Sequence, residues 1–378
     1  MTDRQYNVSS FSSCGCSRQS QGVDWHHKLS LVAFASDHNI VLLRLREKDD
    51  KTVVSARQTR PFHAHGQVVN SVRWTKGNGS ILVSSDIGGT LCVWHLCTDE
   101  LGAWSLNCVL RASELHKNAI SAQASIFLPL RDSASTPGRS AIVSCDTVGN
   151  VLVSAVNRCS RDWKYELDST LETQLKKSRA LCVDVTITPV HELCGHTDWI
   201  RDVRFAPNLA GDDLFLASCA QDNHIRLWKC ARGKPVNYDR VADIPIDEDI
   251  RLKSERFDYE TGDDVISYGV SLESVLSHEG WVFSLCWHKR DRVLLSASMD
   301  KTVVLWAPDS VDGHFWQDSV RLGDLGGQAA GFYGATLSPH GRTIVAHGYN
   351  GALYLWQKNH LNAPRLSTDS TAGICAFG

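Results

Sequence analysis

The sequence lacks an excess of charge of either sign. Its 39 Lys and Arg residues stand against 42 Asp and Glu residues, which leaves a formal net charge of -3. Non-specific binding to nucleic acid depends on many Lys and Arg contacts to phosphate. The composition therefore does not favour a dedicated DNA-binding protein, and we expect no direct contact with tRNA.

Long apolar runs are also missing. The first 22 residues contain no apolar core of a secretory signal peptide, and no stretch is long and apolar enough for a transmembrane helix. The 13 cysteines stand singly, many of them in apolar runs, as at Cys92, Cys145 and Cys219. A reduced thiol in such a place acts as a small hydrophobic group. We therefore expect a reducing compartment, cytoplasmic and nuclear, and no membrane contact.

Motifs that carry chemistry are absent as well. Ser218 and Ser296 do not lie in the G-x-S-x-G elbow that exposes a nucleophile. The glycine-rich stretch "GDLGGQAAG" at 323–331 lacks the order of a phosphate-binding loop. The Cys and His residues between 14 and 27 match no common zinc spacing. We expect no catalytic residue, no cofactor and no metal.

An internal repeat is present. "GHTDWIRDVRFAPNLAGDDLFLASCAQDNHIRLW" at 195–228 aligns with "SHEGWVFSLCWHKRDRVLLSASMDKTVVLW" at 277–306. Short apolar bursts separated by polar turns are typical of strands. Weaker copies lie at 31–45, 68–94, 141–155 and 334–356. Repeated units of four strands predict an all-β fold, a β-propeller.

The repeat spacing also predicts the domain organisation. We expect a flexible N-terminus over 1–22, the propeller over 23–357 with an acidic inserted loop at about 232–265, and a coil tail over 358–378. The units lie near 25–60, 65–112, 117–175, 196–277, 278–323 and 329–357. Residues 176–195 are too short for a further complete unit. We therefore expect about seven blades, one of them degenerate or incomplete.

The repeat resembles the WD-repeat family, whose unit begins near Gly-His and ends near Trp-Asp. The resemblance implies a hydrogen-bonded His, Ser, Asp and Trp tetrad inside a blade. By position, two tetrads would consist of His196, Ser218, Asp222 and Trp228, and of His278, Ser296, Asp300 and Trp306. Partial sets are His65, Ser84 and Trp94, with Gly88 at the Asp position, and Trp356 alone. A hydrolase triad is the alternative for His, Ser and Asp, but the same trio occurring twice favours a structural role.

Further strings resemble the Elongator subunit 2 family, among them "CGHTDWIRDVRF", "LLSASMDKTVVLWAPD" and "AHGYNGALYLW". Members of that family are similar to paired seven-bladed propellers, of which this chain would cover the first. The resemblance implies a non-catalytic scaffold that holds the largest and the catalytic Elongator subunits together for modification of the tRNA wobble uridine. A generic WD-repeat adaptor in signalling or ubiquitin transfer is the alternative, and an enzyme on a propeller is a third.

The inserted loop is the candidate surface for a partner, because insertions in repeat proteins often carry binding. A merely solvated loop is the alternative. The candidate partner-binding residues in this loop are Asp247, Glu248, Asp249, Arg251 and Lys253.

Overall fold

The computed structural model consists of β-strands. It describes residues 6–13, 15–46, 55–58, 62–77, 81–98, 104–127, 140–148, 151–158, 165–173, 193–207, 214–232, 255–261, 264–288, 291–309, 315–323 and 331–358. Every regular element within these ranges is a strand, and the strands form six sheets. No helix in this part of the chain could span a membrane. The expected all-β propeller fold is confirmed.

The first two sheets along the chain are blades 1 and 2. Blade 1 contains β2 (Val23–Trp25), β3 (Leu31–Ser36), β4 (Asn39–Arg46) and β5 (Ser55–Gln58), and the short β6 (Phe62–His63) also pairs with β4. Blade 2 contains β7 (Val69–Trp74), β9 (Ile81–Asp86), β10 (Leu91–Thr98) and β11 (Trp104–Ala112). All residues of β9 are buried, whereas in the outer β11 only Leu106 and Ala112 are buried and the other residues are exposed or half-buried. Apolar bursts in the sequence therefore mark inner strands.

Blades 3 and 4 each carry one additional strand. Blade 3 contains β12 (Ile120–Phe127), β13 (Ser140–Asp146), β14 (Val151–Arg158) and β15 (Tyr165–Thr173), with β8 (Lys76–Gly77) parallel to β12. Blade 4 contains β16 (Ile200–Phe205), β17 (Leu214–Ala220), β18 (His224–Arg232) and β20 (Asp264–Ser277), with β19 (Glu255–Thr261) on β20. The end of the expected inserted loop is thus a β-hairpin, because β20 extends past β18 and offers a free edge to β19.

Blades 5 and 6 complete the set. Blade 5 contains β21 (Val282–Trp287), β22 (Leu294–Ser298), β23 (Thr302–Pro308) and β24 (Trp316–Gly323). Blade 6 contains β25 (Phe332–Leu337), β26 (Thr343–Gly348) and β27 (Ala352–Lys358), and its fourth strand is β1 (Tyr6–Ser13) from the other end of the chain.

The expectation of a flexible N-terminus over 1–22 is wrong for the segment that forms β1. This strand runs antiparallel to β27, from Tyr6 opposite Lys358 to Ser13 opposite Ala352. The Tyr6 hydroxyl donates to the Gly341 carbonyl at 2.7 Å, and its ring lies in the blade 6 core. Blade 6 has only three strands of its own, so without β1 the edge of β27 would be unpaired.

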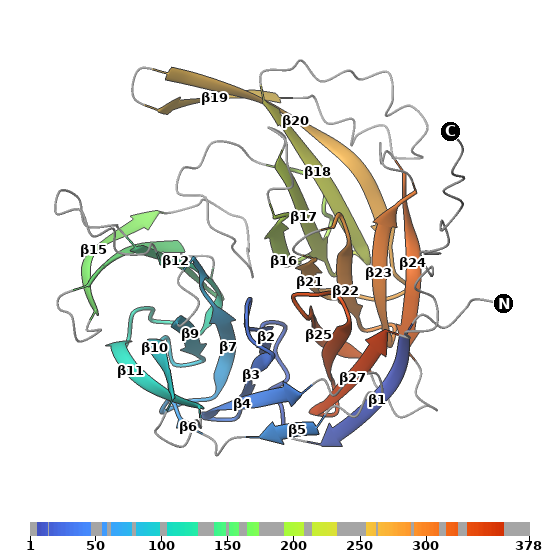
Figure 1. The fold of residues 1–378 in the computed structure, drawn as a ribbon. Helices are drawn as coiled ribbons and strands as arrows, with labels where there is room; N and C mark the ends of the chain where they lie inside the picture. Colours follow the sequence, from blue (N-terminus) through green and yellow to red (C-terminus); the bar gives the residue numbers. More distant parts are fainter. Residues whose placement is uncertain are drawn as a thin grey trace, which may run out of the picture.

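The hydrophobic core lies between neighbouring blades. Separate buried clusters join blades 1 and 2, 2 and 3, 4 and 5, 5 and 6, and 6 and 1. Between blades 3 and 4 only a small cluster is found among the described residues, where Val203 packs against Ala122, Val143 and Cys145. In Figure 1 the sheets follow one another from β15 through β4 and β27 to β18. The expected seventh unit falls mostly on residues 174–192, outside the described residues.

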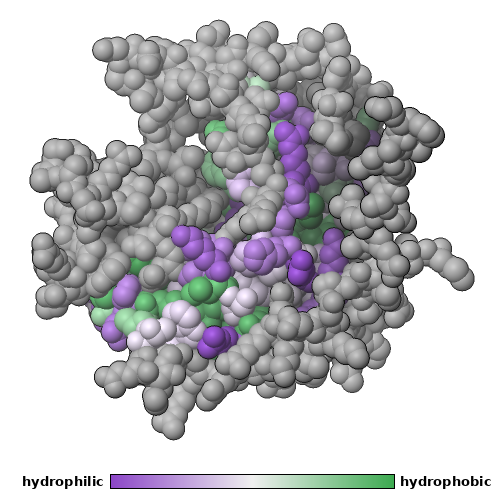
Figure 2. Space-filling view, viewed as in Figure 1, coloured by the Kyte–Doolittle hydropathy of each residue, from purple (hydrophilic) through white to green (hydrophobic). Residues whose placement is uncertain are grey.

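On the face drawn in Figure 2, hydrophilic and hydrophobic residues of the described part lie next to one another in small groups.

Candidate functional site

The polar residues singled out in blade 5 meet in the interior of the sheet. His278 comes from the segment before β21, Ser296 from β22, Asp300 from the following turn and Trp306 from β23. The His278 Nδ1 lies 2.7 Å from Asp300 Oδ2, and its Nε2 lies 2.7 Å from Ser296 Oγ. The Trp306 indole N–H donates to the same Oγ at 2.8 Å. The donors run in one direction: indole to hydroxyl, hydroxyl to imidazole, and imidazole to carboxylate.

Blade 4 repeats this arrangement with His196, Ser218, Asp222 and Trp228. The three distances are 2.8 Å from Nδ1 to Oδ2, 2.8 Å from Nε2 to Oγ, and 3.0 Å from the indole nitrogen to Oγ. Arg226 adds a contact from Nη1 to Asp222 Oδ2 at 3.3 Å. The two serine hydroxyls are thus occupied inside the sheets, a geometry suited to holding strands together.

A complete tetrad also occurs in blade 2, where the sequence predicted only His65, Ser84 and Trp94. The carboxylate is supplied by Asp86, whose Oδ2 lies 2.9 Å from His65 Nδ1. Ser84 Oγ lies 2.7 Å from His65 Nε2 and 2.8 Å from the Trp94 indole nitrogen. The sequence left this set without a carboxylate because Gly88 stands at the turn position, whereas Asp86 reaches the histidine from the end of β9.

Blade 3 holds a partial set, for which the sequence predicted Ser144 but neither His116 nor Asp146. His116 Nε2 lies 2.8 Å from Ser144 Oγ, and its Nδ1 lies 3.7 Å from Asp146 Oδ2. Ser154 replaces the tryptophan. The signal for this variant is Ser-x-Asp at the end of the second strand, shared by Ser84 with Asp86 and by Ser144 with Asp146.

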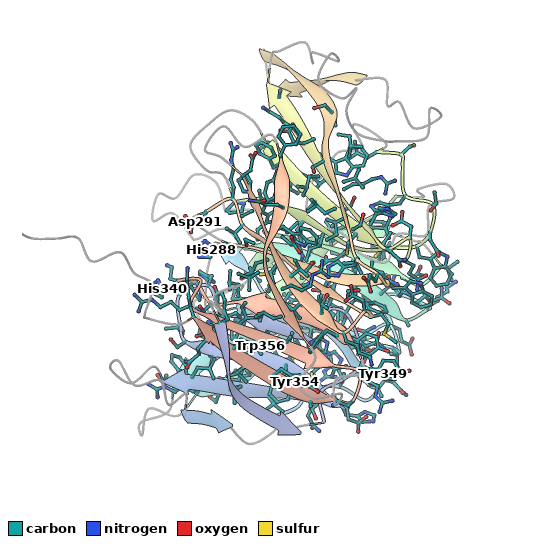
Figure 3. The ribbon with its side chains drawn as sticks, turned by 90° about the vertical axis from the view of Figure 1, so that its right-hand side faces the viewer. His288, Asp291, His340, Tyr349, Tyr354 and Trp356 are labelled. Carbon is teal, nitrogen blue, oxygen red and sulfur yellow. The ribbon has the colours of Figure 1, made fainter. Side chains whose placement is uncertain are left out.

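In blade 6 aromatic packing replaces the tetrad, since Ala346 occupies the serine position. The Trp356 ring lies 5.8 Å from Phe332 and stacks on Tyr354 at 6.0 Å. The Tyr354 hydroxyl accepts a hydrogen bond from Asn350 at 2.8 Å. Figure 3 shows Trp356 and Tyr354 side by side on β27.

Tight turns place the tetrad carboxylates. Asp222 and Asp300 each accept, through Oδ1, the backbone N–H two residues further on, at 3.0 and 2.9 Å. The residues that follow them, Asn223 and Lys301, have φ of 67° and 70°. A carboxylate that bridges its own turn in this way offsets the cost of left-handed backbone at a non-glycine residue.

The tetrad carboxylates are held ionised. Burial alone would raise the pKa of Asp222, but the hydrogen bond and charge of His196 outweigh it and lower that pKa to about 2. The same balance with His278 holds the pKa of Asp300 well below its ordinary value. A lowered carboxyl pKa stabilises the fold above about pH 4, and this stabilisation is lost as the pH falls through the folded-state pKa.

Two further aspartates join neighbouring blades at the inner strands. Asp24 Oδ2 accepts the Trp74 backbone N–H at 2.7 Å, which ties blade 1 to blade 2. Asp202 is fully buried and accepts the Leu285 N–H at 2.9 Å, which ties blade 4 to blade 5. Neither "VDW" around Asp24 nor "IRDVRF" around Asp202 carries a sequence signal for a hydrogen bond to the next blade.

A buried histidine in β26 predicts acid sensitivity. Burial lowers the pKa of His347 to about 4, while Nε2 donates to the Gln19 carbonyl at 2.7 Å. In the unfolded chain His347 is protonated as the pH falls through about 6.5, whereas in the folded chain it stays neutral down to about pH 4. Acid therefore favours the unfolded state. Between about pH 7 and about pH 5 the free energy of unfolding should fall by about 2 kcal/mol from this group.

Urea titrations at both pH values test this, with His347→Gln as the variant that keeps the donor to Gln19. The variant should lose most of the pH dependence; a remainder is expected from His116, whose pKa burial also lowers. An unchanged pH dependence in His347→Gln would contradict the assignment.

The proposed partner-binding residues of the inserted loop lie within 233–254, outside the described residues. Across the described part of the chain, no group of three or more His, Cys, Asp or Glu residues is arranged to hold a metal ion.

Comparison with known families connects the tetrads to a repeat. The family described as "WD domain, G-beta repeat" matches residues 56–95, 187–229 and 269–307. These three segments contain the tetrads of blades 2, 4 and 5, the blades in which His, Ser, Asp and Trp are all present.

Among curated proteins, the chain is similar to "Elongator complex protein 2" from several eukaryotes. It is 44% identical to the Homo sapiens protein over 185 residues, 42% identical to the Drosophila melanogaster protein over 176, and 34% identical to the Dictyostelium discoideum protein over 232. These matches cover 46%, 45% and 51% of this chain, and 21%, 22% and 24% of the relatives. The chain thus spans between a fifth and a quarter of these relatives. The chain therefore contains three segments that match the WD repeat, it has a β-propeller fold, and it is similar to Elongator complex protein 2.

Proposed function

We propose that this chain is a non-catalytic scaffold subunit of an Elongator complex. It would hold the largest and the catalytic subunits together while that complex modifies the wobble uridine of tRNA. The observation that carries the proposal is the similarity to Elongator complex protein 2 in Homo sapiens and in Schizosaccharomyces pombe, at 44% and 29% identity.

The interior chemistry agrees with a binding role. The His, Ser and Asp residues that could suggest hydrolysis are bonded to one another within the sheets, and Ser296 is 0% exposed. A buried hydroxyl that already accepts an indole N–H is not positioned to attack a substrate. Cytoplasmic and nuclear localisation stays a prediction.

Co-expression of the tagged chain with the largest and the catalytic Elongator subunits tests the proposal. We expect all three to co-elute from affinity and size-exclusion columns, since a stable contact buries roughly 1,200–2,000 Å² or more. Pairwise co-expression with each subunit is the control that separates a bridge from a single contact. A soluble, monodisperse chain that elutes alone would contradict the proposal and favour the generic WD-repeat adaptor.

A further inference from the structure

A β-bulge recurs at the start of the inner strand in five blades. In each, the register with the second strand shifts by one residue, which leaves one side chain outside the pairing. The residues at the shifts are Asn70, Ser121, Arg201, Phe283 and Tyr333. Because bulges redirect side chains, these positions can present residues at one end of the propeller.

In blades 2 and 3 the bulge residues are engaged within the fold. Asn70 donates to the Ile120 carbonyl and accepts from Ser85, and Ser121 donates to the Cys145 carbonyl. Their polar groups therefore hold neighbouring strands.

In blades 4, 5 and 6 the bulge residues instead form a continuous stack. The Arg201 guanidinium lies 5.2 Å from the centroid of the Phe283 ring, which lies 5.0 Å from Tyr333. Tyr333 stacks on Tyr349 at 5.3 Å. Two tryptophans flank the stack: Trp199 lies 5.7 Å from Arg201, and Trp281 lies 6.3 Å from Phe283. We call these six residues the aromatic arc.

Three of the six residues of the aromatic arc are exposed to solvent, while Phe283 is buried beneath them. Trp199, Trp281 and Tyr349 are 43%, 46% and 38% exposed. In Figure 3, Tyr349 lies at the opposite end of the strands from His288, Asp291 and His340. Exposed Trp and Tyr beside Arg is the composition of residues that dominate binding energy at protein interfaces.

Two arginines lie at the arc, and in the described part of the chain neither forms a direct ion pair with a carboxylate, although the charge of Asp198 acts on Arg201. Arg201 is half-buried between the rings of Trp199 and Phe283. When the Gln221 side-chain amide is oriented with its oxygen toward Arg201, this oxygen accepts a hydrogen bond from the Arg201 Nε at 3.2 Å. Burial lowers the pKa of Arg201. Arg18 lies 5.4 Å over the Tyr349 ring and is exposed. Guanidinium groups framed by aromatic rings accept carboxylates through paired hydrogen bonds.

We propose that the aromatic arc binds an extended acidic segment of a partner protein, with carboxylates on Arg201 and Arg18 and apolar side chains on Trp281 and Tyr349. This rests on the proposed role as an interaction subunit. Single-stranded nucleic acid would also stack on aromatic rings. The arc, however, offers two arginines beside the exposed carboxyl side chains Asp198 and Glu279, in a chain of net charge -3. A polyanion needs more positive charge than this.

Fluorescence polarisation with the full chain tests the inference. The probes are a labelled peptide that alternates Glu with Phe, the same peptide with Gln in place of Glu, and an oligouridylate of similar length. We expect the acidic peptide to bind, and the Gln peptide and Arg201→Ala each to weaken binding by about tenfold. Trp281→Ala should weaken binding of the acidic peptide as well. This second variant tests the inference independently if Arg201→Ala does not fold.

Phe315→Ala is the matched control. Phe315 is an exposed aromatic of the same blade, but it precedes β24 at the opposite end of the sheet from Trp281. This variant should bind as the unchanged chain does. Equal binding of the Glu and Gln peptides, no effect of Arg201→Ala, or tighter binding of the oligouridylate would overturn the inference.

The same variants separate this inference from the proposed function. If the unchanged chain captures neither Elongator subunit yet binds the acidic peptide as expected, the proposed function fails and the arc stands. If the unchanged chain, Arg201→Ala and Trp281→Ala all capture both subunits equally and no peptide binds, the inference about the aromatic arc is wrong and the proposed function stands.

Discussion

Ser296→Ala should lower the free energy of unfolding by about 4 kcal/mol, because a buried donor or acceptor left unsatisfied costs about 1–3 kcal/mol. The substitution removes one hydroxyl but leaves two groups without a partner: the His278 Nε2 and the Trp306 indole N–H. Both lie in the interior of blade 5, where water does not replace the lost contact. Urea denaturation followed by tryptophan fluorescence measures the change.

Ser319→Ala is the matched control for this prediction. Ser319 is exposed on β24 of the same blade, and its hydroxyl donates to the Leu305 carbonyl at 2.9 Å. Its loss should cost less than about 1 kcal/mol. Equal effects of the two substitutions would show that the tetrad does not stabilise blade 5.

Removal of residues 1–13 should abolish the cooperative fold of blade 6. Seven residues of β1 pair with β27, and each backbone hydrogen bond lost from this pairing costs about 1 kcal/mol net. The deletion also exposes the long edge of β27, which invites association between chains. Differential scanning calorimetry and light scattering measure both effects.

A synthetic peptide of residues 1–15, added in excess, should restore the transition of the shortened chain and suppress its scattering. Tyr6→Phe, which removes only the hydrogen bond to the Gly341 carbonyl, should cost about 1 kcal/mol. A shortened chain that melts cooperatively at the original temperature would contradict the pairing of β1 with β27.

The strands and two tetrads could be predicted from sequence because their signals are local. Apolar bursts in blades 4 and 5 and the constant spacing from Ser to Asp to Trp are visible without any partner strand. The role of Asp86 was not predicted, because the WD-repeat pattern places the carboxylate in the turn, where this blade has Gly88. The structure shows that a carboxylate two residues after the serine reaches the same imidazole.

Long-range pairing could not be predicted. β1 has a weak strand signal, "YNVSSFSS", and its partner lies more than 330 residues away along the chain. The aromatic arc was missed for a related reason. Arg201, Phe283 and Tyr333 occupy equivalent bulges in three consecutive blades, and only the packing of these blades against one another brings them into contact.

Hydrogen–deuterium exchange of the chain alone and in the reconstituted assembly with the largest and catalytic Elongator subunits tests the central claim most directly. That claim is that the chain works by binding partners through the end of the propeller that carries the aromatic arc. We expect assembly to slow exchange in segments 197–201, 279–283 and 331–334 and around Tyr349, with little change around His288 and His340 at the opposite end. Unchanged exchange in those segments, or protection confined to the opposite end, would contradict the account.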